Sequence, residues 1–292
     1  MSRVHDALRK AETAGPPAAP AAQPGAIGAP PILTAEPRRS AFLEEIEEVE
    51  FTPPPDSHLI VVGGAGAVGA SPAEEFRSLR TRLNHLQTLQ PIRTVVITSP
   101  GPAEGKSFTS ANLAIAEAQL ADNPTLLCDF DFRRPVLHSY FNLSRTPGIT
   151  DYLRERATLR ETIRKVAGMN LYVMAAGEAV INPLELLNLT RCKQMIEELA
   201  RHFHWVILDT PPLLYASDAN LLGTLCHGTL LVVRIGVTTI ESVTRAVQTL
   251  CENNLLGVVA NGAHHRELYS KYSSYYSYYY QHEKEAREAA AD

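Results

Sequence analysis

The sequence predicts an α/β fold in which a mostly parallel β-sheet is covered by helices on both faces. Three observations support this prediction. Short runs of β-branched and apolar residues recur along the chain, stretches with helical spacing lie between them, and the runs are apolar throughout. Parallel strands that are buried on both faces have this composition. Ligands of such sheets bind at the carboxyl ends of the strands, so we expect the functional residues there.

The expected elements follow one another from about residue 58. Strands are predicted at 94–98, 125–131, 171–177, 205–212, 228–234 and 255–262. Helices are predicted at 106–121, 190–202 and 239–253. One more helix is expected to open at Ser71, which forms a capping box with Glu74, and to run through Arg82.

The two ends of the chain differ from this middle part in composition. Residues 1–55 hold ten of the 20 prolines, and residues 14–37 are almost entirely Ala, Pro and Gly. Such a segment cannot bury enough apolar surface to offset its chain entropy. We therefore expect a disordered region at 1–57 with a short amphipathic start, a globular domain at 58–264 and a mobile tyrosine-rich tail at 265–292. The glutamates between 44 and 50 are interpreted as a solvated segment.

Charge and apolar patterning exclude several classes of protein. A net charge of −5 leaves no basic excess to neutralise phosphates, which argues against nucleic-acid binding. No apolar run approaches the ~20 residues that a membrane span needs, and the N-terminus lacks the apolar core of a signal peptide. The four cysteines are isolated, so neither a zinc motif nor a disulfide framework is indicated. These features favour a cytosolic protein.

A first glycine pattern, formed by Gly64, Gly66 and Gly69, has the spacing of a dinucleotide-binding turn. That turn requires a helix that opens on the third glycine and an acidic residue about 20 positions later. Here Ser71 and a proline follow, and residues 83–103 contain no Asp or Glu. We interpret the segment as an entry loop.

A second loop, at 100–107, has the pattern of a phosphate-binding P-loop. It lies between a predicted strand and a predicted helix and ends in Gly105, Lys106 and Ser107, although Pro100 stands where such loops usually begin with glycine. Backbone N–H groups at a helix N-terminus cradle phosphate oxygens; Lys106 would reach the β- and γ-phosphates, and the Ser107 hydroxyl would bind Mg²⁺. The residues expected to bind ATP are Gly101, Pro102, Ala103, Glu104, Gly105, Lys106, Ser107 and Phe108.

Carboxylates end two of the later strands. Asp129 and Asp131 form an Asp-x-Asp, so in an extended strand both point to the same side. Asp209 follows four apolar residues, as in a Walker B motif, and could hold Mg²⁺ through water. Singly, such acids often only cap turns. Together with the loop at 100–107 they predict a P-loop NTPase fold with a Mg²⁺–nucleotide site.

These three motifs, in this order, resemble those of the bacterial tyrosine kinase (BY-kinase) family, of the CapB/CpsD/Wzc type, which serves exopolysaccharide biosynthesis. The similarity covers about residues 70–281 and includes the weaker matches 147–153, 175–187, 209–219 and 232–239. The MinD and ParA ATPases share this branch of the P-loop fold. Their signature lysine, five positions before Lys106, is Gly101 in this chain, which disfavours their dimerisation chemistry.

The resemblance implies an ATP-dependent protein-tyrosine autokinase in which Lys106, Asp129 and Asp131 are catalytic. It gives Asp129 the base or hydroxyl-orienting role and places Asp131 and Asp209, with Ser107, around Mg²⁺; the division between Asp129 and Asp131 stays open. Arg133 has two alternatives, steering of phosphate or acceptor, or an Arg–Asp pair that fixes its loop.

The tail carries the expected phosphoacceptors. Seven of the 11 tyrosines lie there, namely Tyr269, Tyr272, Tyr275, Tyr276, Tyr278, Tyr279 and Tyr280. In the resembled family a helical E-x-x-R-x-x-R motif, here Glu74, Arg77 and Arg80, makes the subunit contacts of a ring. A self-paired solvated face is the alternative for this motif. Phosphorylation in trans within such a ring is therefore expected, and the added negative charge should favour dissociation.

The resemblance also implies partners. They are a membrane polysaccharide co-polymerase (chain-length regulator) as activator, a homo-oligomeric ring and a tyrosine phosphatase, with no nucleic acid. The expected location is cytoplasmic, peripheral at the inner face of the plasma membrane through the co-polymerase. The alternatives are a non-catalytic ATP-gated scaffold and a simple MinD/ParA-like ATPase switch. Kinase chemistry predicts phosphate transfer to residues 269–280, whereas the alternatives predict only nucleotide binding or release of inorganic phosphate.

Overall fold

The computed structural model describes residues 41–52, 59, 72–250 and 255–263. Of two compact units, Met1–Arg38 and Arg39–Asp292, the second contains all of them. The amphipathic start, the glycine pattern at 64–69, Ser71 and the seven tail tyrosines lie outside the described residues.

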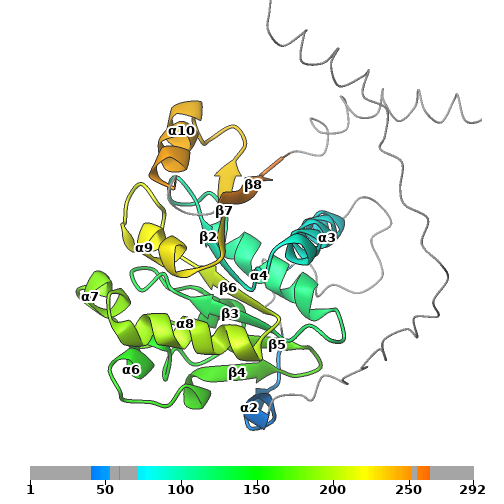
Figure 1. Ribbon diagram of the computed structural model, residues 1–292, viewed down its shortest axis with the longest axis vertical. Helices are drawn as coiled ribbons and strands as arrows, with labels where there is room; N and C mark the ends of the chain where they lie inside the picture. Colours follow the sequence, from blue (N-terminus) through cyan, green and yellow to red (C-terminus); the bar gives the residue numbers. More distant parts are fainter. Residues whose placement is uncertain (1–40, 53–58, 60–71, 251–254, 264–292) are drawn as a thin grey trace, which may run out of the picture. The chain divides into compact units, whose positions relative to one another are not determined.

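The described residues form one eight-stranded sheet in the order β1-β4-β5-β3-β6-β2-β7-β8 (Figure 1). Six neighbouring strands are parallel: β5 (Leu171–Met174), β3 (Thr125–Asp129), β6 (Trp205–Asp209), β2 (Thr94–Thr98), β7 (Gly228–Arg234) and β8 (Leu255–Asn261). At one edge β4 (Ile163–Val166) is antiparallel to β5, and β1 (Glu48–Val49) is parallel to β4. The mostly parallel sheet and its six predicted strands are thus confirmed.

Helices cover both faces of this sheet. One face carries α3 (Pro72–Leu89), α4 (Lys106–Ala118) and α5 (Leu137–Tyr140). The other carries α2 (Ala41–Glu44), α6 (Ile149–Leu153), α7 (Pro183–Leu187), α8 (Thr190–His202), α9 (Asp218–Leu225) and α10 (Ile240–Thr249), and a 3₁₀ turn, Arg160–Thr162, precedes β4. Figure 1 shows α3 and α4 on one side of the strands and α8 and α9 on the other.

Side chains alternate along each central strand between the two cores. In β2, Val95 and Ile97 are buried beneath α3 and α4, whereas Val96 is buried in the core on the opposite face. Both faces of the strand are therefore apolar, which explains why the sequence shows a continuous apolar run and not an alternating one.

Residues 41–52, which we call the N-terminal strap, correct the expectation that 1–57 is disordered. Phe42, Leu43 and Ile46 are buried in a core cluster, and β1 hydrogen-bonds to β4. The five glutamates interpreted as solvated are exposed, and three of them form ion pairs, Glu45 with Arg160, Glu47 with Arg164 and Glu48 with Lys165. Sequence reasoning missed the strap because its three apolar anchors stand in an acidic, proline-flanked context.

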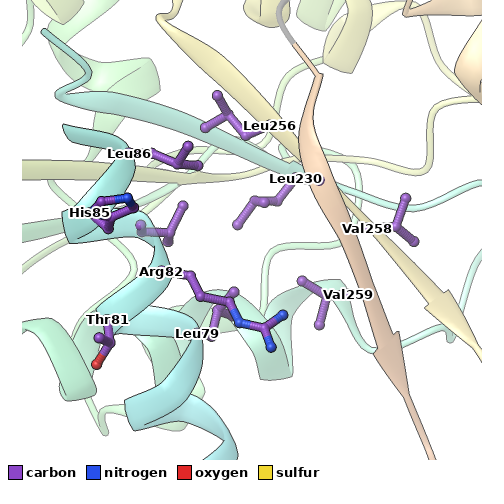
Figure 2. Close-up of a pocket in the computed structure, with 11 residues that line it drawn as sticks. Leu79, Thr81, Arg82, His85, Leu86, Leu230, Leu256, Val258 and Val259 are labelled. Carbon is purple, nitrogen blue, oxygen red and sulfur yellow. The ribbon is translucent and has the colours of Figure 1, made fainter. Parts of the chain in front are cut away.

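An apolar groove of about 520 Å³ lies between α3 and the edge strand β8 (Figure 2). Leucines of α3, β7 and β8 line it, and Leu256 and Val259 lie on the α3 side of the edge strand. Within the described part of the chain, no residue of the loop 99–107 lines the groove, so it is separate from the expected phosphate site. No helix among the described residues is long and apolar enough to cross a membrane.

Candidate functional site

Strand register brings the predicted motifs to one edge of the sheet. Asp129 at the end of β3 is aligned with Asp209 at the end of β6, and Ile97 of β2 is aligned with the same Asp209. The loop 99–105, which follows β2, therefore emerges beside both carboxylates. This juxtaposition follows from the strand order β3-β6-β2, which places the three motif-bearing strands next to one another.

The loop after β2 is closed on itself by short hydrogen bonds. The Ser99 hydroxyl donates to the Gly101 carbonyl over 2.6 Å, and the Gly101 N–H donates to a Glu104 carboxylate oxygen over 2.8 Å. Ala103 has a φ of 60°, a conformation that is uncommon for residues with a Cβ and is concentrated at functional sites. The loop is thus held in an unusual backbone conformation by its own buried glutamate.

Gly105 joins this loop to the helix that carries Lys106. Its φ is 99°, in the left-handed region that favours glycine. A Cβ built at this position would lie 1.8 Å from Nδ2 of Asn261. The glycine of the predicted P-loop is therefore required both by its backbone conformation and by the close approach of β8.

Three side chains fasten the loop: Arg234 at the end of β7, Thr238 in the turn that follows it, and Asn261 at the end of β8. Arg234 donates to the Ala103 carbonyl over 3.1 Å, Asn261 donates to the Glu104 carbonyl over 2.9 Å, and the Thr238 hydroxyl donates to the Glu104 carboxylate over 2.6 Å. Sequence reasoning assigned no role to these residues, although Arg234 and Thr238 lie within the weaker match at 232–239 and Asn261 lies in a predicted strand.

Lys106, the first residue of α4, reaches the carboxylates of the neighbouring strands. Its Nζ lies 2.8 Å from Oδ2 of Asp131 and 3.3 Å from the Ser107 hydroxyl. Burial alone would lower the pKa of Lys106, but the negative charges of Asp209 and Asp131 outweigh burial and raise it. Lys106 therefore stays charged and lies where a phosphate could replace the Asp131 carboxylate as its partner.

Asp129 and Asp131 have different environments although they are two residues apart. Asp129 is fully buried, and one of its oxygens accepts the N–H groups of Val136 and Leu137 at the start of α5, over 3.1 and 3.0 Å. Its other oxygen accepts the Asp131 N–H. Burial, and then the charge of Asp209, raise the pKa of Asp129 well above its usual range. This geometry does not favour the base role that the resemblance gives to Asp129.

Asp209 supplies the clearest indication of a cation. Its Oδ1 accepts the Ser110 hydroxyl over 3.2 Å, whereas Oδ2 is buried and has no hydrogen-bond partner among the described residues. Burial raises the pKa of Asp209, and the charge of Lys106 and a hydrogen bond from Ser107 oppose that effect. A buried carboxylate oxygen beside the hydroxyl of Ser107 fits Mg²⁺, a hard cation that keeps several waters and binds phosphate oxygens. In the described chain no closed group of three or more His, Cys, Asp or Glu side chains forms a metal site, so phosphate and water would have to complete the shell.

The remaining site residues are accounted for as follows. Arg133 pairs with Asp218, the second of its two predicted alternatives. Phe108 is half-buried and packs edge-on against Phe76 of α3.

The predicted interface motif is divided between two environments. Glu74 and Arg77 are exposed and pair with each other over 2.9 Å, which matches the self-paired alternative. Arg80 instead turns inward and donates to the Ala116 carbonyl over 2.8 Å. Of the three motif residues, therefore, Glu74 and Arg77 are exposed on α3, whereas Arg80 is half-buried.

Known proteins resemble this chain over most of the described region. Tyrosine-protein kinase YwqD of Bacillus subtilis is 35% identical over 192 residues, which are 65% of this chain and 81% of YwqD. Tyrosine-protein kinase Etk of Escherichia coli is 35% identical over 198 residues, 67% of this chain but only 27% of Etk. No family model matches the chain.

Solved structures agree with these relatives. The kinase domain of Escherichia coli Etk superimposes with a TM-score of 0.63 at 35% identity, covering 66% of this chain and 76% of that domain. Apo McdA of Cyanthece superimposes with a TM-score of 0.50 at 19% identity, over 57% of this chain and 71% of McdA, and that likeness concerns the fold alone.

Proposed function

The chain belongs to the family of bacterial tyrosine-protein kinases, and we propose that it transfers the γ-phosphoryl group of ATP to tyrosines of its own tail, residues 269–280, in trans. The observation that carries this proposal is the meeting of a charged lysine, a P-loop and two strand-end carboxylates. Lys106 lies 2.8 Å from Asp131, and the buried Oδ2 of Asp209 has no hydrogen-bond partner among the described residues. Such an arrangement suits a reaction that depends on positioning and on neutralisation of phosphate charge.

In the proposed reaction the tyrosine hydroxyl oxygen forms the new P–O bond, the bond from the γ-phosphorus to the bridging oxygen of ATP breaks, and ADP leaves. A free tyrosine has a pKa near 10, so its proton must pass to a carboxylate as the bond forms. Asp131 suits this role, because its Oδ2 becomes available when Lys106 turns to the phosphates. Asp129, occupied by the N-terminus of α5, would then hold the loop that presents Asp131.

Mg²⁺ bound at Ser107 and Asp209 would neutralise charge on the transferred phosphoryl group. The P-loop backbone from Gly101 to Phe108 would cradle the phosphates. The second assignment is supported by the way Arg234, Thr238 and Asn261 hold Ala103 and Glu104 of this loop.

The proposal extends to regulation of exopolysaccharide synthesis. A ring built on Glu74 and Arg77 would bring the tail of one subunit to the site of the next, with Arg80 joining only if it leaves Ala116. A membrane polysaccharide co-polymerase would activate the kinase and place it at the inner face of the plasma membrane, and a tyrosine phosphatase would reset it. Each added phosphate brings about −1.5 to −2 charges, which favours ring dissociation.

The experiment is intact-mass analysis of the purified chain after incubation with Mg²⁺ and ATP. We expect additions of about 80 Da each that map to 269–280. Asp131→Asn should abolish them, whereas Asp129→Asn should mainly lower stability. Release of inorganic phosphate without mass additions would identify an ATPase switch, and ATP binding with neither product would identify a scaffold. Equal loss of transfer in both variants, at equal stability, would contradict the division between the two aspartates.

A further inference from the structure

Arg133 and Asp218 form a charged pair that links the two segments leaving the motif-bearing strands β3 and β6. We propose that Asp218 is a positioning residue for phosphoryl transfer: by holding Arg133, it fixes the loop that carries Asp131 relative to Asp209. The inference rests on the proposed phosphoryl transfer. It concerns a residue to which sequence reasoning assigned no role.

The pair has two contacts. Nε of Arg133 lies 3.2 Å from Oδ2 of Asp218, and one terminal guanidinium nitrogen lies 3.4 Å from Oδ1. The Asp218 side chain is 0% exposed and the Arg133 side chain is 48% exposed. Removing the partner of a buried charge strongly destabilises a protein. Asp218 therefore holds Arg133 more firmly than an exposed carboxylate would. Within the described residues Arg133 supplies both hydrogen bonds that the Asp218 carboxylate accepts.

Asp218 is held at the start of a helix and is buried. It is the first residue of α9, where the helix dipole favours a negative charge. The preceding residue, Ser217, makes no side-chain capping bond. The backbone of Asp218 is part of α9, and both of its carboxylate oxygens contact the Arg133 guanidinium.

Two segments are joined by this pair. Arg133 lies two residues after Asp131, and the N–H of the next residue, Arg134, donates to Asp131 Oδ1 over 3.0 Å. On the other side, Asp218 closes the segment that begins after Asp209. Because Asp131 and Asp209 flank the place proposed for Mg²⁺ and the transferred phosphoryl group, their separation should depend on the Arg133–Asp218 pair.

A direct role of Arg133 on phosphate makes a different prediction. In that case Asp218 would be only one of several groups near the guanidinium, and its removal would free Arg133 to bind nucleotide. In the positioning role, removal of either partner releases the same loop. The two roles are therefore separated by a double-mutant cycle.

The experiment uses the full chain with Arg133→Ala, Asp218→Asn and the double variant. For each, the Mg²⁺ dependence of phosphate transfer and of binding of a fluorescent ATP analogue is measured, together with kcat and KM. We expect the Mg²⁺ requirement of both to rise roughly 10- to 100-fold, as for groups that orient a metal's ligands. The double variant should be no worse than either single one, and Arg133→Lys should recover part of the effect.

The matched control is Arg134→Ala, which removes the neighbouring arginine side chain but keeps the N–H that binds Asp131; it should leave the Mg²⁺ dependence unchanged. Additive losses, a defect in Arg133→Ala that Asp218→Asn does not share, or a loss of stability with an unchanged Mg²⁺ requirement would each overturn the proposal. If wild-type protein binds the analogue but transfers no phosphate, the proposed function fails. The Mg²⁺ dependence of binding still tests the Arg133–Asp218 pair in that case.

Discussion

The loop 99–107 and the N-terminal strap are held in place by opposite means. The loop is fixed by hydrogen bonds at the meeting point of five parallel strand ends, two of them within the loop and three from Arg234, Thr238 and Asn261. The strap is fixed at the sheet edge by apolar anchors and by ion pairs to residues more than 110 positions away. We therefore expect the conformation of the loop to matter for catalysis and the contacts of the strap to matter for stability.

The largest difference in phosphate transfer is expected between replacement of Lys106 and replacement of Lys165, the β4 residue that pairs with the strap. Lys106→Met removes the charge that faces Asp131 and, by our proposal, the phosphates, so phosphate transfer should fall about 10³-fold. Lys165→Met removes the strap's partner for Glu48 and should change transfer less than about twofold, because surface pairs contribute little. Initial rates of transfer at saturating ATP measure both. A comparable loss in the two variants would break the comparison.

Truncation of an apolar side chain in the strap tests the expected role of the strap in stability. Phe42 is buried and stacks on His202 with ring centroids 4.3 Å apart. Phe42→Ala should lower the free energy of unfolding by about 4 kcal/mol, mainly through the cavity it leaves, while kcat stays unchanged. Urea denaturation measures the loss, with the exposed Leu89→Ala as control. A fall in kcat at full folding would mean that the strap also serves chemistry.

Helix α4, which begins at Lys106, carries the carboxyl group of Glu117, whose contribution to the stability of the fold depends on pH. Burial raises the pKa of Glu117 from about 4.5 to about 7, opposed by a hydrogen bond from Asn84 and by the charge of Arg80. Because the folded pKa is the higher one, the contribution of Glu117 to stability is fully present below pH 4.5 and is lost as the pH rises through 7.

The size of this effect is about 3 kcal/mol between pH 4.5 and 8. Glu117→Gln should therefore flatten the decline of the melting temperature with pH, and the exposed Glu75→Gln should leave it unchanged. An unaltered slope in Glu117→Gln would show that the carboxyl is ionised in the folded protein. The loop itself should be unaffected, so the Mg²⁺ requirement of ATP binding should not change.

The smallest effect is expected from the strap's surface charges. Glu48→Gln removes one exposed ion pair and should change the free energy of unfolding by less than about 1 kcal/mol, and less still at high salt. Chemical denaturation at two salt concentrations checks this. A loss as large as that of Phe42→Ala would show that charge, and not apolar burial, holds the strap.

The same contrast explains what could be predicted from the sequence. Strand β2 was predicted at its observed bounds, and the loop 100–107 and the three aspartates were singled out as candidates, because apolar runs and strand-end motifs are local signals. The fastening of the loop by Asn261 and the pairing of Arg133 with Asp218 depend on which strands become neighbours. No pattern along the chain encodes that order. The strap was missed for the same reason, since its partner strand β4 is polar in its middle and short.

The long separation in sequence between β1 and its partner strand β4 has a consequence for synthesis on the ribosome. Glu48 is translated 117 residues before Lys165, its partner. At about 5 to 20 residues per second, the strap waits on the order of ten seconds before its docking edge exists. During that interval β1 has no strand to pair with, and we expect the glutamates beside Phe42, Leu43 and Ile46 to act as gatekeepers that keep the nascent segment in solution. In this way the acidic run would protect the growing chain before it forms its ion pairs in the folded protein.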